Sequence, residues 1–147
     1  MKILGNFIKY ILSFLLIFQH MAYAASYSSV EYLVPDGSSN TIIDRAQNGT
    51  PILNSATVNE RGVSLNNMSD FNIYDENLII NNSLDIGNSQ LGGTLYANPN
   101  FTNDRTANII INQVTSNKRT NLQGFAEIFG SRSELVIANP NGRVTNL

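Results

Sequence analysis

The residues of this chain that could act as acids, bases or nucleophiles are few and scattered. Asp75 and Glu76 are adjacent, and Asp70 precedes them in the same segment. Paired carboxylates could serve as general acid and general base, but these lie in polar segments, where solvated carboxylates are ordinary surface residues. The adjacent basic pair Lys118 and Arg119 also lies in a polar loop. We therefore predict no catalytic residue.

Imidazole and thiol chemistry is absent from the expected mature protein. The whole chain has one histidine and no cysteine, and that histidine, His20, lies in an N-terminal segment that we expect to be removed. This excludes the usual nucleophile–base pairs, zinc sites and imidazole bases. No phosphate-binding loop is present either. We therefore expect no enzyme activity, no cofactor and no metal site.

Residues 1–24 have the pattern of a signal peptide. Lys2 and Lys9 form a basic start, the run from Tyr10 to Phe18 is apolar except for one serine, and Ala22-Tyr23-Ala24 suits cleavage. A transmembrane anchor is the alternative, but a spanning helix needs about 20 apolar residues, and this run is shorter. We predict cleavage after Ala24 and one mature domain, residues 25–147.

The charge of the mature chain argues against nucleic acid as a partner. The full chain has a formal net charge of −2, and loss of Lys2 and Lys9 with the signal peptide leaves −4. A nucleic-acid-binding domain would show a basic patch instead. Because disulfides are impossible without cysteine, the domain must be stabilised by packing and backbone pairing.

A short phrase occurs twice and organises the rest of the chain. Residues 96–101 and 137–142 each place Ala-Asn-Pro-Asn after an apolar run, and they begin 41 positions apart. Asn-Pro favours a turn, and asparagine after the proline can close it. Each phrase therefore predicts a strand followed by a sharp corner. The residues concerned are Asn98, Pro99 and Asn100 in the first copy, and Asn139, Pro140, Asn141 and Gly142 in the second.

The remaining pattern predicts an all-β chain of many short strands. The mature residues contain 21 asparagines, which alternate with compact apolar runs such as residues 78–80, 109–111 and 135–137. Apolar residues at helical spacing are not sustained anywhere in residues 25–147, and all four prolines fall at expected turns. We expect strands over residues 26–34, 58–65, 70–74, 107–114, 122–129 and 134–138, among others.

Two architectures fit these strands. A sandwich or barrel would favour alternation of polar and apolar residues along each strand, whereas several strands here are continuous apolar triplets. Short triplets with polar corners suit one coil of a β-solenoid, in which asparagines can stack as ladders. On that reading the 41-residue spacing is two coils of about twenty residues each.

The order of the motifs resembles the two-partner secretion domain that opens filamentous haemagglutinins and related exoproteins. Residues 62–73 resemble a family stretch written G-[IV]-S-x-N-x-[YF]-x-x-F-[ND]-[VI], and residues 78–83 resemble its next segment. The two Asn-Pro-Asn phrases are similar to the family motifs Asn-Pro-Asn-Leu and Asn-Pro-Asn-Gly-Ile. The residues that match family positions outside the two phrases are Gly62, Ser64, Asn66, Phe71, Asn81, Asn82 and Ser83.

The resemblance implies a fold and a function. The fold would be a right-handed parallel β-helix with an N-terminal cap. Export would use the Sec machinery and signal peptidase, and then an outer-membrane transporter whose periplasmic domains read this domain as an address. The protein would be secreted or held on the surface of a Gram-negative bacterium. The Asn-Pro-Asn residues are the candidates for transporter recognition or for a structural role.

Three departures from the family pattern stand out. Phe101 replaces leucine and keeps an apolar anchor, Arg143 replaces isoleucine and does not, and Asn77 stands where the family usually has glycine. The family domain also extends beyond the length of this chain. We therefore expect an incomplete β-helix and a truncated copy, in which the second phrase marks the cut. Receptors on host cells or glycans would be bound through a missing C-terminal region.

Two other functions remain open at this stage. An adhesin would bind glycans through asparagines and aromatic residues such as Tyr74, Tyr96 and Phe125, if these gather on one face. A β-helix enzyme acting on polysaccharide is the third possibility, although no convergent acid–base set is visible. The class of cargo, whether adhesin, haemolysin or growth-inhibition toxin, is not encoded in these residues.

Overall fold

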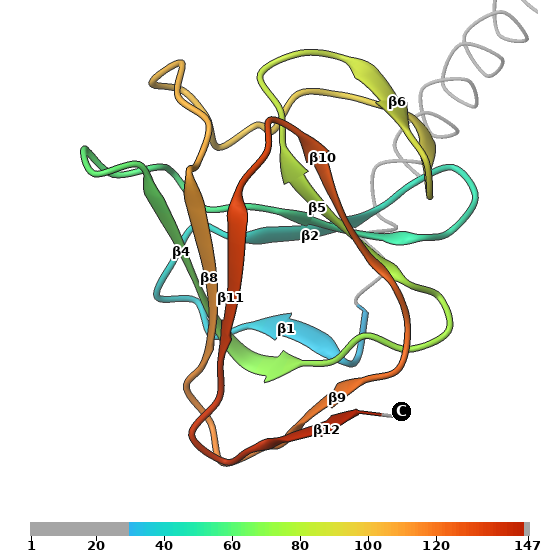
Figure 1. Cartoon of the computed structure of the whole chain (residues 1–147), viewed down its shortest axis with the longest axis vertical. Coiled ribbons are helices and arrows are strands. Elements are labelled where there is room, and N and C mark those ends of the chain that lie inside the picture. The colour runs from blue at the N-terminus through green and yellow to red at the C-terminus, as the bar shows by residue number, and fades with distance from the viewer. Residues whose placement is uncertain (1–29, 146–147) are drawn as a thin grey trace, which may run out of the picture.

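A computed structural model describes residues 30–145, so the expected signal peptide lies outside the described residues. Its elements in this range are strands (Figure 1), and none of it is a helix long and apolar enough to cross a membrane. The strands are β1 (Leu33–Pro35), β2 (Ile42–Arg45), β3 (Pro51–Asn54), β4 (Val63–Phe71), β5 (Leu78–Asn82), β6 (Gly87–Ser89), β7 (Gly93–Leu95), β8 (Ile109–Val114), β9 (Thr120–Leu122), β10 (Ala126–Gly130), β11 (Glu134–Ala138) and β12 (Arg143–Thr145).

Parallel stacking of like strands gives a β-helix with three faces. One face has the strand order β1-β4-β8-β11, a second has β10-β5-β3-β2, and the third pairs β9 with β12. Coil 1 therefore runs through β3 and β4, coil 2 through β5, β8 and β9, and coil 3 through β10, β11 and β12. An isolated parallel bridge from Ile73 to Leu122 continues the third face into coil 1. The solenoid prediction is confirmed, and the sandwich is wrong.

The coils are longer than the sequence spacing predicted. Asn54 and Asn81, which are stacked neighbours in β3 and β5, are 27 residues apart. Asn66 and Asn112, stacked in β4 and β8, are 46 residues apart, because coil 2 contains a long excursion between β5 and β8. The spacing of 41 residues between the two Asn-Pro-Asn phrases is therefore not two coils of twenty.

An antiparallel cap closes the N-terminal end of the solenoid, as the resemblance predicted. β1 pairs antiparallel with β4, and β2 pairs antiparallel with β3. Both cap strands are short, and they carry Pro35 in β1 and the charged residues Asp44 and Arg45 in β2. Such residues discourage the addition of another strand at a sheet edge. The other end of the solenoid, formed by coil 3, has no such strands within residues 30–145.

The main hydrophobic core fills the interior of the coils. Its members include Leu53 and Ile80, which stack on each other in β3 and β5, and Ile110 of β8 with Phe71 and Met68 of β4 on the neighbouring face. All five are fully buried. Inward-facing positions alternate with outward ones along β8, whose burial pattern follows the period of two expected for a strand. Residues of coil 3, such as Leu135 and Ile137, pack on this core but remain half-buried.

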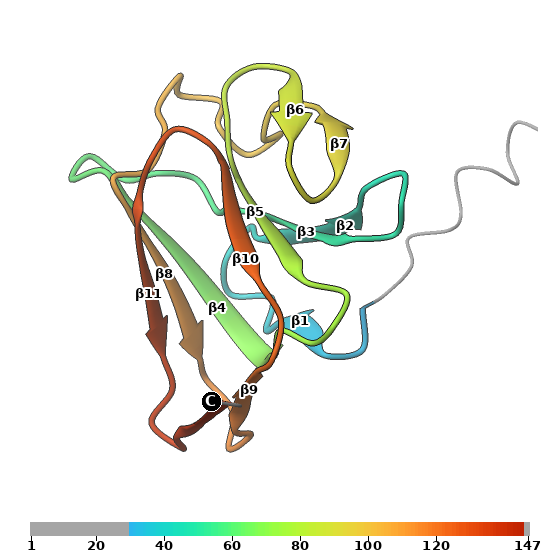
Figure 2. The ribbon, with the colours of Figure 1, turned by 45° about the vertical axis from the view of Figure 1, so that its right-hand side comes forward.

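The excursion of coil 2 forms a second, smaller core outside the solenoid. The antiparallel hairpin of β6 and β7 lies over the outer face of the β5 sheet (Figure 2). Leu95 of β7 packs there with Ile52, Ile79 and Phe129, and all four are buried. A side chain at Gly92 would stand 2.5 Å from Ile79 Cδ1, so the glycine permits close packing of the hairpin.

The structure differs from the predicted strands in two places. The expected strands over residues 58–65 and 70–74 are replaced by one strand, β4, which begins at Val63 and continues to Phe71. Along it Ser64, Asn66 and Met68 all face inward. The expected strand 122–129 is two strands separated by a corner at Gly124, where an added Cβ would stand 1.9 Å from the Tyr74 carbonyl oxygen. Polar residues inside the core and a glycine inside an apolar run concealed both features.

A further strand follows the second phrase, although Arg143 departs there from the family pattern. Residues Arg143–Thr145 form β12, which pairs in parallel register with Thr120–Leu122 of β9. Backbone pairing needs no particular side chain, so the exposed Arg143 does not stop the coil. Asn77 is also accounted for: its φ of 63° is the left-handed conformation that glycine and asparagine adopt most readily.

Candidate functional site

The first Asn-Pro-Asn corner is a side-chain-closed turn. The backbone N–H of Asn100 donates to Asn98 Oδ1 at 2.9 Å, which is an Asx turn. Asn98 Nδ2 donates to the carbonyl oxygens of Ser55 and Asn81, at 2.9 and 2.8 Å. One amide thus joins the excursion to two stacked coils.

The second asparagine of this corner has a similar role. Asn100 Nδ2 donates to the carbonyl oxygens of Ser55 and Asn54, at 3.1 and 3.3 Å. Phe101, which follows, is buried in the main core, so the apolar anchor predicted from the sequence is present. Asn98 is 4% exposed and Asn100 is 7% exposed, whereas Pro99 is at the surface. The asparagine amides of the first corner are therefore internal structural groups.

The second corner has the same turn at a different place in the coil. The N–H of Asn141 donates to Asn139 Oδ1 at 2.9 Å. Asn139 Nδ2 donates to Thr120 Oγ1 at 2.8 Å, and Asn141 Nδ2 donates to the Ser116 carbonyl at 2.8 Å. Gly142 has a φ of 90°, which disfavours any residue with a Cβ. This corner is half-buried.

The two corners are not stacked on each other. The first lies between β7 and β8 and is bonded to the carbonyls that follow β3. The second lies between β11 and β12 and is bonded to the loop between β8 and β9. They belong to different edges of the solenoid, so the interpretation of one repeated coil position is wrong. What the two corners share is chemistry: asparagine amides that satisfy carbonyls of a neighbouring loop.

The residues matched in β4 form part of an internal polar ladder. Asn66 Oδ1 accepts from Thr41 Oγ1 and from the Ala56 N–H, both at 2.8 Å, and its Nδ2 donates to Asn112 Oδ1 at 2.9 Å. Ser64 Oγ donates to the Ala56 carbonyl at 2.7 Å. All of these side chains are buried, and buried polar groups need such partners.

Gly62 and Phe71 lie at the two ends of the same motif. Gly62 has a φ of 78°, and a Cβ there would stand 2.6 Å from Asn108 Nδ2, so both conformation and space favour glycine. Phe71 is fully buried in the main core. The motif therefore specifies how coil 1 turns and packs.

The matched residues at the end of β5 and directly after it hold the start of the excursion. Asn81 Nδ2 donates to Asn54 Oδ1 and to the Tyr96 carbonyl. Asn82 Oδ1 accepts from the Ala107 N–H, and its Nδ2 donates to the carbonyls of Ala107 and Ser131. Ser83 Oγ donates to the Asp85 carbonyl. Because Ala107 is where the chain returns to the solenoid, Asn82 connects both ends of the excursion.

Sequence reasoning missed one functional group of this framework, Glu127. Its carboxylate accepts from Ser89 Oγ at 2.7 Å and from the N–H groups of Gln90 and Leu91, both at 2.9 Å. The hairpin turn is thereby fastened to coil 3. Desolvation opposes ionisation of this carboxyl, but the three hydrogen bonds together outweigh it and lower the pKa of Glu127. The signal in the sequence that could have indicated this role is that Glu127 is the single charged residue of an otherwise apolar strand.

The acidic and basic residues considered for chemistry do not converge. Asp70 Oδ2 accepts from Lys118 Nζ at 2.8 Å, an ion pair between coils 1 and 2. Asp75 and Glu76 are exposed, and Glu76 lies 3.9 Å from Arg45. No group of three His, Cys, Asp or Glu side chains that could hold a metal occurs in residues 30–145. These carboxylates form surface and inter-coil contacts.

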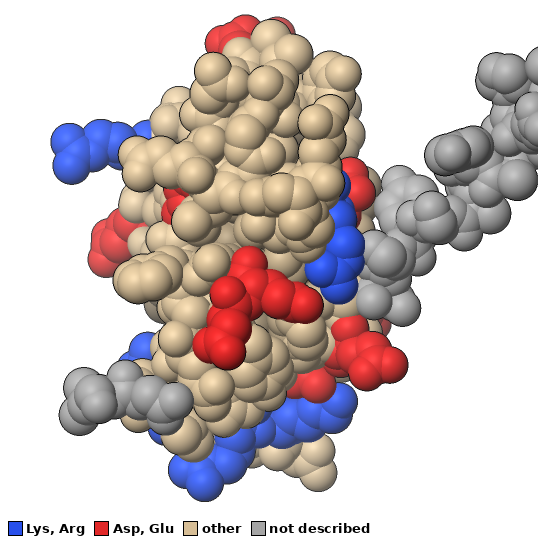
Figure 3. All heavy atoms as spheres, turned by 90° about the vertical axis from the view of Figure 1, so that its right-hand side faces the viewer, with Lys and Arg blue, Asp and Glu red and all other residues tan. Residues whose placement is uncertain are grey.

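The charged residues also do not form one basic face on the side seen in Figure 3. Acidic and basic side chains are both present there, and basic ones gather at the end where β9 and β12 lie (Figure 3). Lys118, Arg119 and Arg143 belong to this end and are exposed.

The three aromatic residues considered for glycan binding have different surroundings. Tyr74 packs edge-to-face against Tyr32, with ring centroids 5.1 Å apart. Tyr96 is 78% exposed and lines a pocket, whereas Phe125 is 77% exposed and does not line that pocket. The three aromatic residues therefore do not line one pocket.

Comparison with known proteins identifies relatives of this chain. The family "TPS secretion domain" matches residues 31–146. A protein named 16S rRNA endonuclease CdiA, from Enterobacter cloacae subsp. cloacae, is 43% identical over 110 residues, which are 74% of this chain and 3% of the relative. The filamentous hemagglutinin of Bordetella pertussis is 39% identical over 114 residues, which are 78% of this chain and 3% of that protein. The chain thus spans a small fraction of these relatives.

The fold has a counterpart of known structure. The crystal structure of a filamentous hemagglutinin secretion domain aligns with a TM-score of 0.71 and 39% sequence identity. The alignment covers 78% of this chain and 37% of that chain. Similarity of sequence and of fold therefore point to the same group of proteins.

Proposed function

Because the chain belongs to the family of TPS secretion domains, we propose that it is the address by which a larger exoprotein is exported through a cognate outer-membrane transporter. The partner would be the periplasmic recognition domains of that transporter. The observation that carries this proposal is the placement of both Asn-Pro-Asn corners, and of the motif residues that precede them in the chain, at the contacts between coils.

Burial of the first corner bears on when the transporter acts. The amides of Asn98 and Asn100 are internal and already donate to carbonyl oxygens of neighbouring coils. A transporter that contacts these amides must therefore bind the chain before the coils form. This supports recognition of an extended chain, in which a periplasmic domain adds the segment as a strand to its own sheet.

Folding would then follow on the far side of the membrane. If the N-terminus leaves the transporter first, the cap and coil 1 fold before the later coils. Each folded coil then offers a strand edge on which the next coil pairs in parallel. Residues 1–24 would direct the earlier step through the Sec machinery and be removed by signal peptidase. The exported product would be secreted or displayed on the surface of a Gram-negative cell.

The address would be independent of the cargo. Relatives with different printed names, an rRNA endonuclease and a hemagglutinin, share this region with the chain at similar identity. We therefore assign export to these residues, and we assign any adhesive, haemolytic or toxic activity, with its host receptors, to other regions of such proteins.

The experiment must separate recognition from stability, because the same asparagines stabilise the folded coils. The chain is co-expressed with its cognate transporter as wild type, Asn100→Ala, Ile110→Ala and Asn117→Ala. Ile110 is fully buried in the core and lies outside the motifs. Asn117 is exposed and makes no hydrogen bond through its side chain within residues 30–145. Export is measured in the culture supernatant, and binding of the urea-unfolded chain to the purified periplasmic domains is measured in parallel.

The two measurements give distinct results for recognition and for folding. We expect Asn100→Ala to reduce both export and binding of the unfolded chain, and Asn117→Ala to change neither. Ile110→Ala should destabilise the fold by roughly 2–5 kcal/mol without weakening binding of the unfolded chain. If unfolded Asn100→Ala binds the periplasmic domains as wild type does, and export follows stability alone, the recognition role is refuted.

A further inference from the structure

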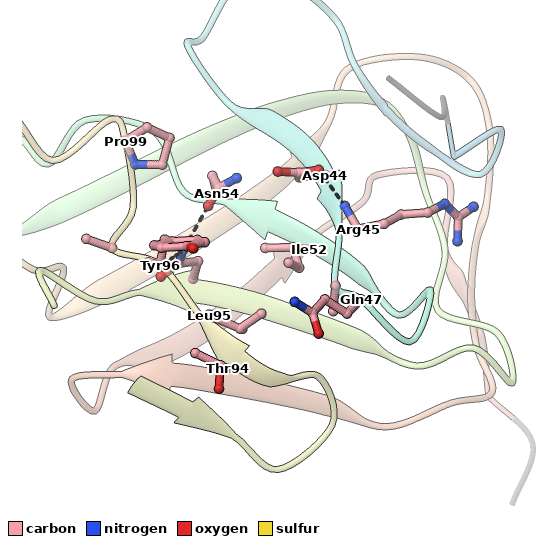
Figure 4. A pocket seen from close by; sticks show the side chains of 12 residues that line it. Asp44, Arg45, Gln47, Ile52, Asn54, Thr94, Leu95, Tyr96 and Pro99 are labelled. Carbon is pink, nitrogen blue, oxygen red and sulfur yellow. Dashed lines mark hydrogen bonds between the residues drawn. The ribbon is translucent and has the colours of Figure 1, made fainter. Parts of the chain in front are cut away.

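A pocket of about 280 Å³ opens between the hairpin and the N-terminal cap. Its walls come from the end of β2 and the residues after it, from β3 and β5, and from β7 with the segment that leads to Pro99 (Figure 4). This volume is near the lower end of pockets that hold small molecules, about 300–1,000 Å³. Of the first Asn-Pro-Asn corner, Pro99 lines this pocket, and Asn98 and Asn100 do not.

The floor of the pocket is apolar and one wall is aromatic. Ile52 and Leu95, both buried in the second core, lie beside Tyr96 in Figure 4. Tyr96 leaves 78% of its surface exposed, while its carbonyl oxygen is held by Asn81 Nδ2 at 3.1 Å. A fixed backbone with an exposed ring presents a flat apolar surface, which suits a ligand with a flat apolar face of its own.

Polar groups at the rim have spare hydrogen-bonding capacity. Neither the Gln47 amide nor the Tyr96 hydroxyl has a hydrogen-bond partner within residues 30–145, and both residues are exposed. Asp44 Oδ1 accepts from the Arg45 N–H at 2.8 Å, and its other oxygen has no partner in the same part of the chain. An amide offers both donors and acceptors, and a carboxylate accepts only. Together these groups suit a ligand with several hydroxyls.

The charge at the rim argues against an acidic ligand. Arg45 contributes to the lining, but its guanidinium donates to the Gly49 carbonyl at 2.7 Å and lies 3.9 Å from Glu76. Figure 4 shows this side chain directed away from Ile52 and Leu95. Asp44 is therefore the charged group that remains beside the opening, and it would repel a carboxylate or sulfate.

We propose that this pocket binds a neutral saccharide, with one ring face against Tyr96 and hydroxyl groups hydrogen-bonded to Gln47 and Asp44. A pyranose combines an apolar face of C–H groups with hydroxyls around its edge, which is the combination that the lining provides. This proposal does not rest on the export function, because a sugar ligand would be bound by the folded, exported chain.

The test uses the secreted chain and defined sugars as probes. Methyl glycosides of glucose, galactose and mannose, together with N-acetylglucosamine, are titrated by ligand-observed NMR up to ~10 mM, a range that detects Kd values near 1 mM. Glucuronic acid serves as the acidic counterpart. The variants are Tyr96→Ala, Gln47→Ala and the matched control Phe125→Ala, whose ring is equally exposed but lies outside the pocket. Thermal melts check that each variant is folded.

We expect at least one neutral sugar to bind, about tenfold weaker binding to Tyr96→Ala, and unchanged binding to Phe125→Ala. Binding should also weaken in Gln47→Ala, and glucuronic acid should bind less well than glucose. The proposal is overturned if no neutral sugar binds, if Tyr96→Ala binds as tightly as Phe125→Ala, or if the acidic sugar is preferred. Failure here would leave the export result of Asn100→Ala unchanged, so the two proposals are tested separately.

Discussion

Asparagine is the residue that distinguishes this protein, and its buried amides explain why the chain contains so many. In a β-helix the corners leave backbone carbonyls and N–H groups that no neighbouring strand satisfies. Asn66, Asn82 and Asn98 each make hydrogen bonds with two or more such groups or ladder neighbours, and all three are buried. An amide that both donates and accepts can do this without carrying charge into the core.

Replacing Asn66 with alanine should be strongly destabilising. The change removes the acceptor for Thr41 Oγ1 and the Ala56 N–H and the donor to Asn112 Oδ1, all inside the protein. Since each buried group left without a partner costs about 1–3 kcal/mol, we expect a loss of roughly 2–4 kcal/mol in the free energy of unfolding. Urea denaturation of the secreted chain measures it.

Two variants control this prediction. Asn117→Ala removes an exposed asparagine and should change stability by about 0.5 kcal/mol or less. Asn66→Asp keeps the acceptor oxygens but loses the donor and buries a charge against Asn112 Oδ1, so it should be at least as harmful as alanine at neutral pH. A loss for Asn66→Ala no greater than that for Asn117→Ala would contradict the ladder.

At the scale of single elements, the β6–β7 hairpin depends on contacts with both coil 3 and the N-terminal region. The Leu91 carbonyl accepts from Asn48 Nδ2 at 2.7 Å, in the turn between β2 and β3. The Leu91 N–H donates to Glu127 in β10 at 2.9 Å. One residue of the hairpin turn is therefore fixed by coil 3 and by the N-terminal region, so the hairpin can be complete only after coil 3 has formed.

Protonation of Glu127 should loosen the hairpin. The pKa of this carboxyl is lower in the folded chain than the unfolded value of 4.5, because its three hydrogen bonds outweigh its desolvation. Its contribution to stability is therefore fully present above that unfolded value and is lost as the pH falls through the folded pKa. We expect faster hydrogen exchange of residues 87–95 as the pH is lowered from ~6 to ~3, after correction for the intrinsic rate.

Glu127→Gln provides the comparison for this pH effect. Glutamine keeps the size and one acceptor oxygen but does not titrate in this range. The variant should show a loosened hairpin at neutral pH and less additional loosening in acid than the wild type. If hydrogen exchange of the hairpin depends on pH identically in the two proteins, Glu127 does not fasten the hairpin to coil 3.

At the scale of the whole molecule, the two ends of the solenoid differ. The N-terminal end is closed by short antiparallel strands that carry proline and charged residues. At the other end, coil 3 presents β10 and β11 at sheet edges, with Ile128, Leu135 and Ile137 only half-buried. A repeat protein is stabilised by the interfaces between neighbours, so this end is the weaker one.

We predict that the isolated chain of residues 25–147 is marginally stable and self-associates as its concentration rises. Unpaired strand edges and half-covered apolar side chains favour addition of another chain. Thermal melting monitored by circular dichroism, with gel filtration over a range of concentrations, measures both properties. A monomer that melts cooperatively at high temperature at every concentration would contradict the prediction.

Sequence alone determined the class of fold and the identity of the motifs. Apolar triplets between Asn, Gly and Pro corners indicated many short strands, and the ordered phrases indicated a secretion domain with a β-helix and a cap. These inferences depend on conformational preferences of short segments, which can be read from adjacent residues. Pro99 and Pro140 restrict the backbone at the corners. The apolar run of residues 78–80 forms a buried strand. The family assignment followed from the same local order.

The tertiary structure alone decided which coil each residue joins. The excursion between β5 and β8 makes Asn66 and Asn112 neighbours across 46 positions, and it places the two Asn-Pro-Asn corners on different edges of the solenoid. The hydrogen bonds of Glu127 to the hairpin turn join segments that are distant in the sequence. The pocket beside Tyr96 is also lined by segments that are distant in the sequence. Contacts of this kind depend on how many residues each coil contains, and an insertion changes that number without altering any motif.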